Sequence, residues 1–379
     1  MHVCVGFYDV GIVGEAFTYA VLPQQEEFIG VGVVVTVPFG ATQKEGIVFA
    51  INEDNQSENI RTVISVRQHK YTSLMPKVYF ETMIWIAKYY RSPLHKVLRL
   101  FLPEKIWTEK FDAERFVVVQ IPQNIPKIPS NGTKIKEIYA AIEEKVDVWN
   151  VFSKSYLRKL EEKKYLSLSY GAYVPVATGS TYEADSTGIP ELTVEQTKIY
   201  EEIMSDPKKT FLLFGVTGSG KTRIYLEIAK TMFAQGKQTL FLVPEIALTP
   251  QLLAYFGKYF GDKMSVLHSH LSTGEKQQEW VRIISGQSQV IVGSRSALFA
   301  PILNPGAIII DEEHEWTYKN EQNPRYHARD VAVYMQKTMS LLLLLGSATP
   351  SIESMYNARE GKYKLISLPE KIYEQRKRK

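Results

Sequence analysis

Residues 215–222 have the types and spacing of a P-loop, GVTGSGKT. Glycines let backbone N–H groups wrap a phosphate without a clash from Cβ, and the start of a helix adds its dipole. An apolar stretch at 211–214 enters the loop and a helix-like pattern leaves it, so a chance glycine-rich turn is the less favoured alternative. We expect the Lys221 ammonium group to reach the β- and γ-phosphates of ATP and the Thr222 hydroxyl to ligate Mg²⁺. The predicted ATP-binding residues are Gly215, Val216, Thr217, Gly218, Ser219, Gly220, Lys221 and Thr222.

A second box, of acidic residues, follows an apolar stretch at 307–310 and reads Asp311, Glu312, Glu313 and His314. Ligands of parallel sheets sit at the carboxyl ends of the strands, where these acids would lie. We predict that Asp311 holds Mg²⁺ through water. Glu312 would orient and deprotonate the water that attacks the γ-phosphate. The alternative is that these acids merely begin a helix, since carboxylates favour helix N-termini.

Further polar loops follow other apolar stretches, at 243–249, 293–297 and 346–350. Their hydroxyls and amides could hold a nucleic-acid backbone. The last of them, with Gly346, Ser347, Ala348 and Thr349, would place small hydroxyl residues near the nucleotide, and the family resemblance given below implies that it couples the nucleotide to DNA. Short apolar stretches alternate here with helix-length segments, which predicts a parallel sheet covered by helices. The predicted strands are 211–214, 239–243, 290–292, 307–310 and 341–345.

The chain as a whole is predicted to be an α/β multidomain protein, with a RecA-like P-loop lobe at residues 191–379. Residues 1–108 begin with a stretch rich in β-branched residues, which predicts a small strand-rich fold, and helical spacing of apolar residues predicts a helix at 77–91. Residues 112–176 read as two helices and a strand pair at 165–174, which is typical of a winged-helix domain whose basic helix, 153–164, binds DNA. A packing or spacer domain with a solvated basic face is equally open. Glycine, serine and proline at 177–190 predict a linker.

The composition is that of a globular protein, with 45% hydrophobic and 23% charged residues and a formal net charge of +4. This mild basicity permits a nucleic-acid partner but does not argue for one. A single cysteine, Cys4, excludes an intrachain disulfide and a cysteine-based zinc site. The N-terminus is unlike a signal peptide, and the longest apolar run, 341–345, is too short to span a bilayer. We therefore expect a cytoplasmic protein with no membrane partner.

The order of these motifs resembles that of superfamily 2 helicases: Gln196, the P-loop, the loops at 243–249 and 293–297, the acidic box and the box at 346–350. The likeness is greatest to the PriA family of replication-restart helicases and covers nearly the whole chain. It implies an ATP-dependent 3′ to 5′ DNA helicase of primosome assembly at stalled forks, and it gives Gln196 a role in ATP binding. The implied partners are forked DNA with single-stranded 3′ ends, the single-strand-binding protein and primosome components. A kinase or a transporter ATPase is the less favoured alternative.

Two further segments carry the resemblance to this family. The segment 311–330 is similar to its aromatic-rich loop, which is implied to couple DNA contact to ATP hydrolysis through faces on which bases could stack. In the N-terminal block, Phe17, Gly40 and Arg61 would line a pocket for the base at a DNA 3′ end. The family commonly has aspartate where this chain has Thr18, and glycine near His95, which predicts a weakened 3′-end preference. The predicted DNA-binding residues are Phe17, Thr18, Gly40, Arg61, Arg295, Trp316, Tyr318, Arg325, Tyr326 and Arg329.

The family is also known for a cysteine-rich zinc module and a second motor lobe, neither of which is found in this sequence. The second lobe supplies an arginine that stabilises charge on the transferred phosphoryl group. We therefore expect these 379 residues to bind nucleotide and DNA, to hydrolyse ATP very slowly and not to unwind DNA. The main alternative is a DNA- and nucleotide-binding module that neither hydrolyses ATP nor unwinds DNA.

Overall fold

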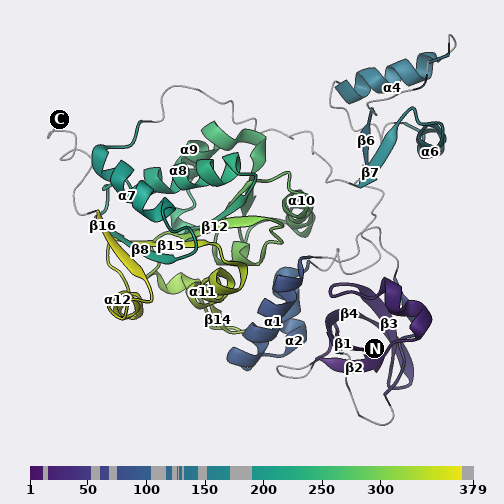
Figure 1. The fold of residues 1–379 in the computed structure, drawn as a ribbon, viewed down its shortest axis with the longest axis horizontal. Coiled ribbons are helices and arrows are strands. Elements are labelled where there is room, and N and C mark those ends of the chain that lie inside the picture. The colour runs from purple at the N-terminus through teal and green to yellow at the C-terminus, as the bar shows by residue number, and fades with distance from the viewer. Residues whose placement is uncertain are drawn as a thin grey trace.

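The computed structural model describes residues 1–11, 16–52, 60–67, 75–103, 117–121, 126, 128–129, 132–143, 152–170 and 190–368. Nearly all of the predicted linker at 177–190 lies outside these residues, as does the predicted boundary near 108–112. Figure 1 shows a large lobe built on a parallel sheet, an N-terminal sheet, and a small unit of helices and strands at the upper right.

The N-terminal block forms a five-stranded antiparallel sheet in the order β2-β1-β4-β3-β5. Valines alternate along its strands, so that one face buries Val3, Val5, Val35 and Val37. The hairpin between β3 and β4 turns at Gly40, whose φ of +59° lies in the left-handed region. The strands are β1 (His2–Gly6), β2 (Phe17–Ala20), β3 (Val34–Phe39), β4 (Thr42–Asn52) and β5 (Ser65–Val66).

Two helices follow this sheet, α1 (Lys77–Tyr89) and α2 (Leu94–Phe101), and the helix predicted at 77–91 is thereby confirmed. They lie between the sheet and the large lobe (Figure 1), and they share one apolar core with that lobe. Trp280 of the lobe donates its indole N–H to the backbone oxygen of Phe101, at 3.0 Å. The first and last blocks of the chain are therefore joined by packed and hydrogen-bonded contacts.

The small unit consists of β6 (Val117–Gln120), α4 (Thr133–Glu143), α6 (Lys154–Glu162) and β7 (Ser167–Tyr170). Its core is apolar and holds Ile135, Ile138, Leu157, Leu160 and Leu166. We predicted a strand pair within 165–174; of this segment, residues 171–174 lie outside the described residues, and β7 pairs with β6, which precedes both helices. Local alternation cannot show this, because the partner strand lies about fifty residues away in the sequence.

The large lobe is built on a seven-stranded parallel sheet in the order β10-β11-β9-β12-β15-β8-β16. The five predicted strands are confirmed, whereas the edge strands β10 and β16 were not predicted. Their apolar runs are short and mixed with polar residues, as is usual for strands with one open edge. The strands are β8 (Thr210–Gly215), β9 (Gln238–Leu242), β10 (Met264–Leu267), β11 (Val290–Gly293), β12 (Pro305–Ile310), β15 (Leu342–Ser347) and β16 (Lys364–Leu368).

Helices cover both faces of this sheet, which explains why its central strands are apolar throughout. Along β8, Phe211 and Leu213 face the core under α7, α8 and α9, while Leu212 faces the core under α10, α11, α1 and α2. None of the helices that the structure describes is long and apolar enough to cross a membrane. The lobe helices are α7 (Val194–Met204), α8 (Lys221–Ala234), α9 (Pro250–Phe260), α10 (Thr273–Ile284), α11 (Ala328–Met339) and α12 (Ile352–Arg359).

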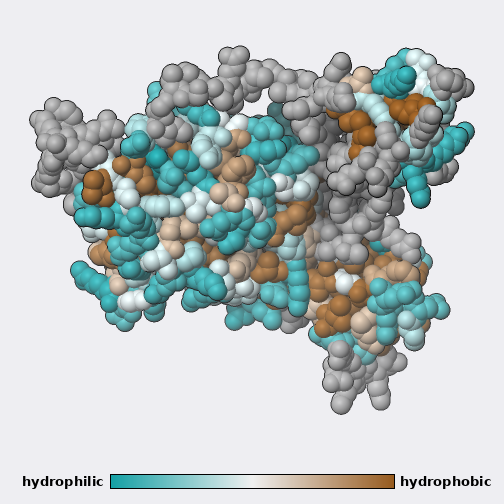
Figure 2. Space-filling model, turned by 45° about the horizontal axis from the view of Figure 1, so that its top comes forward, coloured by the Kyte–Doolittle hydropathy of each residue, from teal (hydrophilic) through white to brown (hydrophobic). Residues whose placement is uncertain are grey.

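Hydrophobic residues reach the surface over the N-terminal sheet. Figure 2 shows them gathered at the lower right, whereas the face of the large lobe is mostly hydrophilic. The exposed large hydrophobic residues of this sheet and its connections are Leu22, Phe28, Ile51 and Ile64, each 38–45% exposed.

Candidate active site

The predicted P-loop joins the end of β8 to the start of α8, and its shape requires glycine. Gly218 and Gly220 have φ values of +82° and +90°, which side chains other than glycine rarely adopt. A Cβ on Gly215 would lie 2.8 Å from the Ser219 hydroxyl and 3.0 Å from the Leu368 backbone oxygen. The Ser219 hydroxyl is buried and has no hydrogen-bond partner within the described part of the chain. The loop is therefore tightly closed and lined by backbone, and the buried Ser219 hydroxyl inside it makes no hydrogen bond to the described residues.

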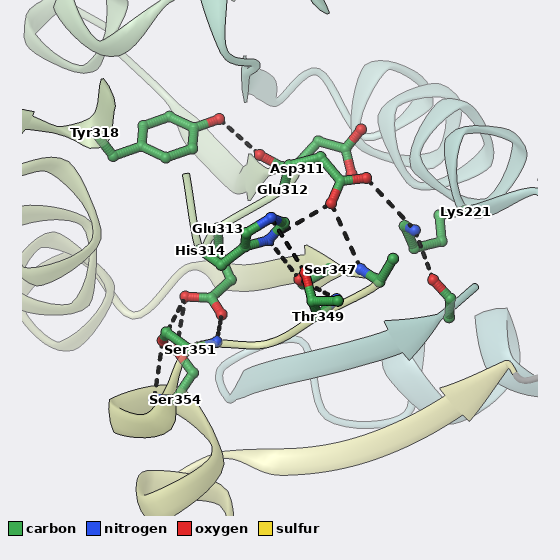
Figure 3. Close-up of polar contacts among 12 residues, drawn as sticks. Lys221, Asp311, Glu312, Glu313, His314, Tyr318, Ser347, Thr349, Ser351 and Ser354 are labelled. Atoms are coloured by element: carbon green, nitrogen blue, oxygen red, sulfur yellow. Dashed lines mark hydrogen bonds and ion pairs between the residues drawn. The ribbon is translucent and has the colours of Figure 1, made fainter. Parts of the chain in front are cut away.

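Lys221 lies at the centre of the site and is only 7% exposed. Its ammonium group donates to the Gly215 backbone oxygen at 2.7 Å and lies 3.7 Å from a carboxylate oxygen of Glu312 (Figure 3). The charge on this lysine is thus held between the P-loop and the acidic box. Any anion that enters the loop would meet this charge at the start of α8, where the helix dipole also favours negative charge.

Gln196 ties the start of α7 to the P-loop. Its side-chain oxygen accepts from the Thr193 backbone N–H at 2.9 Å, and its amide nitrogen donates to the backbone oxygens of Ser219 and Gly220 at 3.4 Å each. The side chain is buried. The structure therefore places this predicted ATP-binding residue against the back of the loop, where it fixes the loop's position.

Asp311 follows β12 directly, and its carboxylate accepts a hydrogen bond of 2.9 Å from the hydroxyl of the fully buried Tyr225. Burial, with the nearby carboxylate of Glu312, raises the pKa of Asp311 to about 6. Glu312 itself has a φ of +44°, which turns its carboxylate away from the strand and toward Lys221. The end of β12 thus places two carboxylates near one lysine, as the motifs predicted.

His314 connects the acidic box to the loop at 346–350. Its Nδ1 lies 2.7 Å from the Ser347 hydroxyl and its Nε2 lies 3.2 Å from the Thr349 hydroxyl (Figure 3). A carboxylate oxygen of Glu312 lies 3.5 Å from the backbone nitrogen of Ala348. The acidic box and the loop at 346–350 are therefore in direct polar contact, so that a movement of one would displace the other.

Glu313 is a residue for which the sequence predicted no role, and it proves to be the best-connected acid of the box. It is 1% exposed, and it accepts from the Arg329 guanidinium at 3.0 Å, the Ser351 backbone N–H at 2.7 Å and the Ser354 hydroxyl at 2.8 Å. Its backbone N–H donates to the Gly346 oxygen at 2.9 Å. Local sequence could not reveal this, because its partners lie 16 to 41 residues further along the chain.

The residue types of this site suit a phosphate and a divalent cation. The P-loop supplies backbone, a lysine and the buried Ser219 hydroxyl for the anion. Thr222 and Asp311 supply a hydroxyl and a carboxylate, the oxygen donors that Mg²⁺ prefers, and Mg²⁺ usually keeps several waters as its other ligands. Two protein donors are therefore enough, and the residues present fit this ion.

Comparison with known proteins gives two family matches. Residues 3–103 match the PriA 3′ DNA-binding domain, described as "3'DNA-binding domain (3'BD)", and residues 189–352 match the family "Type III restriction enzyme, res subunit". Replication restart protein PriA of Chlamydia pneumoniae is 34% identical over 367 residues, which are 92% of this chain and 48% of the relative. The PriA protein of Bacillus subtilis is 50% identical over 185 residues, 48% of this chain and 23% of the relative.

The chain is a homologue of PriA. The predicted resemblance is confirmed, and the chain spans about half the length of the curated relatives that it matches along most of its own length. Among solved structures, a complex titled "Structure of RecG bound to three-way DNA junction" aligns with 50% of this chain and 25% of that chain, at 25% identity and a TM-score of 0.38.

Within the part that matches the PriA 3′ DNA-binding domain, the structure brings the predicted pocket residues together. The Arg61 guanidinium donates to the Gly40 backbone oxygen at 2.8 Å. The Phe17 ring packs on Phe39, next to Gly40, with ring centroids 5.6 Å apart. Thr18 is the neighbour of Phe17 on β2, and side chains alternate along a strand, so Thr18 faces the other side of the sheet.

We expected the aromatic residues that follow the acidic box to be exposed for base stacking, but only one of the three predicted residues is exposed. Trp316 is 75% exposed, but Tyr318 and Tyr326 are only 1% and 4% exposed. The Tyr318 hydroxyl donates to the Asp311 backbone oxygen at 2.7 Å, and the Tyr326 ring packs against Phe299 with centroids 4.9 Å apart. The two tyrosines therefore do not offer faces to bases in this structure, because both complete the core beneath the loop.

Of the three predicted DNA-binding arginines in the large lobe of this homologue of PriA, two make their contacts within the protein. Arg295 donates to the backbone oxygens of Thr317 and Lys319, and it lies over the Tyr326 ring at 5.7 Å. Arg329 is buried beside Glu313, as described above. Arg325 is exposed, with one hydrogen bond of 3.3 Å to the Glu321 backbone oxygen. Arg325 and Trp316 are thus the predicted residues of this loop that are open to a ligand.

Proposed function

We propose that this chain is the DNA- and ATP-binding part of a PriA-type replication-restart helicase, a DNA-dependent ATPase with 3′ to 5′ polarity. The observation that carries the proposal is the meeting of Lys221 and Glu312 at 3.7 Å, at the carboxyl ends of strands from two separate motifs. The match of residues 3–103 to a DNA-binding domain supports DNA as the partner of this site.

Each residue of the site has a role in this proposal. Lys221 would exchange the Gly215 backbone oxygen for phosphate oxygens. Thr222 and Asp311 would hold Mg²⁺, which when bound would neutralise charge on the phosphates. Glu312, held near the Ala348 backbone nitrogen, would orient a water and accept its proton. His314 and the loop at 346–350 would pass changes at this site to the DNA-binding surface.

Nucleotide binding is tested by Lys221→Ala. A fluorescent ATP or ADP analogue with Mg²⁺ should bind this variant roughly 10- to 100-fold more weakly, since a buried charged hydrogen-bond donor to phosphate is lost. The matched control is Lys230→Ala, which removes a more exposed lysine from the same helix. Equal affinity of Lys221→Ala and wild type would remove the basis for this assignment.

DNA binding is proposed to use the N-terminal sheet and the basic helix α6 of the small unit, which we propose to be a winged-helix domain. Contacts to phosphates predict an affinity for forked DNA that falls steeply as salt rises. Arg61 beside Gly40 supports a weak preference for a free 3′ hydroxyl over a 3′ phosphate. Binding that is independent of salt would contradict the phosphate contacts. The single-strand-binding protein and primosome components are proposed as partners on the likeness to PriA alone.

The 379 residues assayed on their own are proposed to bind forked DNA and nucleotide without separating the strands. The described residues hold one RecA-like sheet, and phosphoryl transfer in two-lobed motors also uses an arginine from the opposite lobe. A gel assay with forked DNA and MgATP tests this proposal. Robust ATP-dependent unwinding by this polypeptide would contradict it.

A further inference from the structure

Tyr90 follows α1, and its hydroxyl reaches the first turn of α11, some 240 residues further along the chain. The hydroxyl accepts from the backbone N–H of His327 at 3.1 Å and donates to a carboxylate oxygen of Asp330 at 2.9 Å. The side chain is partly buried, so these bonds are partly shielded from water. One phenol thus makes two polar contacts to the same helix terminus.

The contacted residues are the ones that cap α11. His327 is the N-cap residue, and its Nδ1 accepts from the Arg329 backbone N–H at 3.2 Å. Asp330 is the third residue of the helix. In an ordinary capping box the side chain at this third position accepts directly from the N-cap backbone N–H. Here the Tyr90 hydroxyl stands between the two groups, so the cap of α11 is completed by a residue from the N-terminal block.

The helix that Tyr90 caps carries Arg329 one residue before Asp330. The Arg329 guanidinium binds Glu313 at 3.0 Å and the Ser351 hydroxyl at 2.5 Å. Figure 3 shows the carboxylate of Glu313, a member of the acidic box, next to Ser351 and Ser354. Ser351 in turn follows the loop at 346–350. The first turn of α11 is therefore in direct side-chain contact with Glu313 of the acidic box and with Ser351.

The surroundings of Tyr90 leave little room for independent movement. Trp85 of α1 stacks on Tyr334 of α11 with ring centroids 4.4 Å apart and planes inclined by 13°. On the other side of α1, Phe80 packs edge-on against Phe49 of β4, at 5.2 Å. Packed interiors transmit displacement because they have few voids to absorb it. A change in the N-terminal sheet would thus reach α11 through α1.

We propose that Tyr90 is a positioning residue that couples occupation of the DNA 3′-end region to the ATP site, through the cap of α11, Arg329 and Glu313. This inference rests on the proposed function. A hydroxyl that served folding alone would stabilise the protein equally with and without ligands. A positioning hydroxyl also sets how strongly one ligand changes the affinity for the other.

The test measures the Kd of a fluorescent ADP analogue with Mg²⁺, with and without a saturating oligonucleotide that has a free 3′ end, in the full chain. Wild type should show a Kd ratio of about fivefold or more, and Tyr90→Phe should bring the ratio below about twofold while each ligand alone binds as in wild type. The matched control is Tyr89→Phe, the same change at the neighbouring tyrosine, which is 62% exposed. This control should keep the wild-type ratio.

A wild-type ratio near one, or a full ratio retained in Tyr90→Phe, would overturn the proposal. Hydrogen exchange of the free protein supplies a readout that needs neither ligand. Tyr90→Phe should speed exchange of the amides of His327 and Ser351, and unchanged exchange at both would also overturn it. Failure of the proposed function would give a different result, because nucleotide or DNA would then not bind to wild type. Hydrogen exchange would still show whether Tyr90 holds the cap of α11.

Discussion

One added methyl group at Gly346 should disturb the candidate site more than most core substitutions. A Cβ there would lie 1.8 Å from the hydroxyl oxygen of Tyr225, 2.9 Å from its Cζ and 3.3 Å from a carboxylate oxygen of Asp311. Tyr225 is fully buried and cannot swing into solvent. Gly346→Ala must therefore push the tyrosine ring into its neighbours and break its hydrogen bond to Asp311.

The size of the effect follows from these two consequences. Overpacking a close-packed core costs about 1–3 kcal/mol. Losing a hydrogen bond to a charged or partly charged carboxylate costs about 1.5–3 kcal/mol. Since both occur at one place, we expect Gly346→Ala to lower the free energy of unfolding by about 3–5 kcal/mol. This is a large share of the roughly 5–15 kcal/mol that is typical of a folded protein.

Urea denaturation of the 379-residue protein measures this loss, with Gly274→Ala as the control. Gly274 lies in the first turn of α10, where an added Cβ meets nothing closer than 4.0 Å, so alanine should be neutral or mildly stabilising. Tyr225→Phe removes the atom at 1.8 Å, so Gly346→Ala in that background should cost less. An unchanged denaturation midpoint in Gly346→Ala would refute the reasoning.

Three further predictions concern the charged and aromatic residues of the lobe. Glu313→Gln leaves the buried Arg329 without its closest carboxylate. Urea denaturation should show that this lowers the free energy of unfolding by about 3–5 kcal/mol. A loss below about 1 kcal/mol would show that the ion pair contributes little to stability. The folded pKa of Asp311, about 6, lies above its usual 3.8, so the stability that its protonated form contributes is complete below about pH 4 and is lost as the pH rises through 6. In metal-free protein the stability of wild type relative to Asp311→Asn should thus fall by about 3 kcal/mol across this window, and a flat difference would contradict the raised pKa. Trp316→Ala should change the free energy of unfolding by no more than about 0.5 kcal/mol, because the side chain is exposed. In a fluorescence titration the same variant should bind single-stranded DNA more weakly by about 1–3 kcal/mol. An unchanged affinity would rule out base stacking on Trp316.

The burial of Tyr318 and Tyr326 marks where inference from the sequence reached its limit. Their spacing near Trp316 and Arg325 suited a base-binding loop, and nothing in the local sequence separates an exposed tyrosine from a buried one. Their burial depends on Phe299, on the Asp311 backbone and on Arg295, which all lie outside the segment 316–326. The same holds for Glu313, whose counter-ion Arg329 lies on the next helix.

The sequence by itself determined the features that depend on neighbours in the chain. These are the P-loop with its left-handed glycines, the five central strands, the helix at 77–89 and the order of motifs that identified the family. Tertiary structure alone decided that β7 pairs with β6, that α1 and α2 complete the core of the lobe, and that Tyr90 caps α11. Backbone conformation and strand periodicity are set within a few residues, so local sequence reveals them. Contacts across a core depend on how segments tens to hundreds of residues apart pack together, and the sequence of either segment alone does not reveal them.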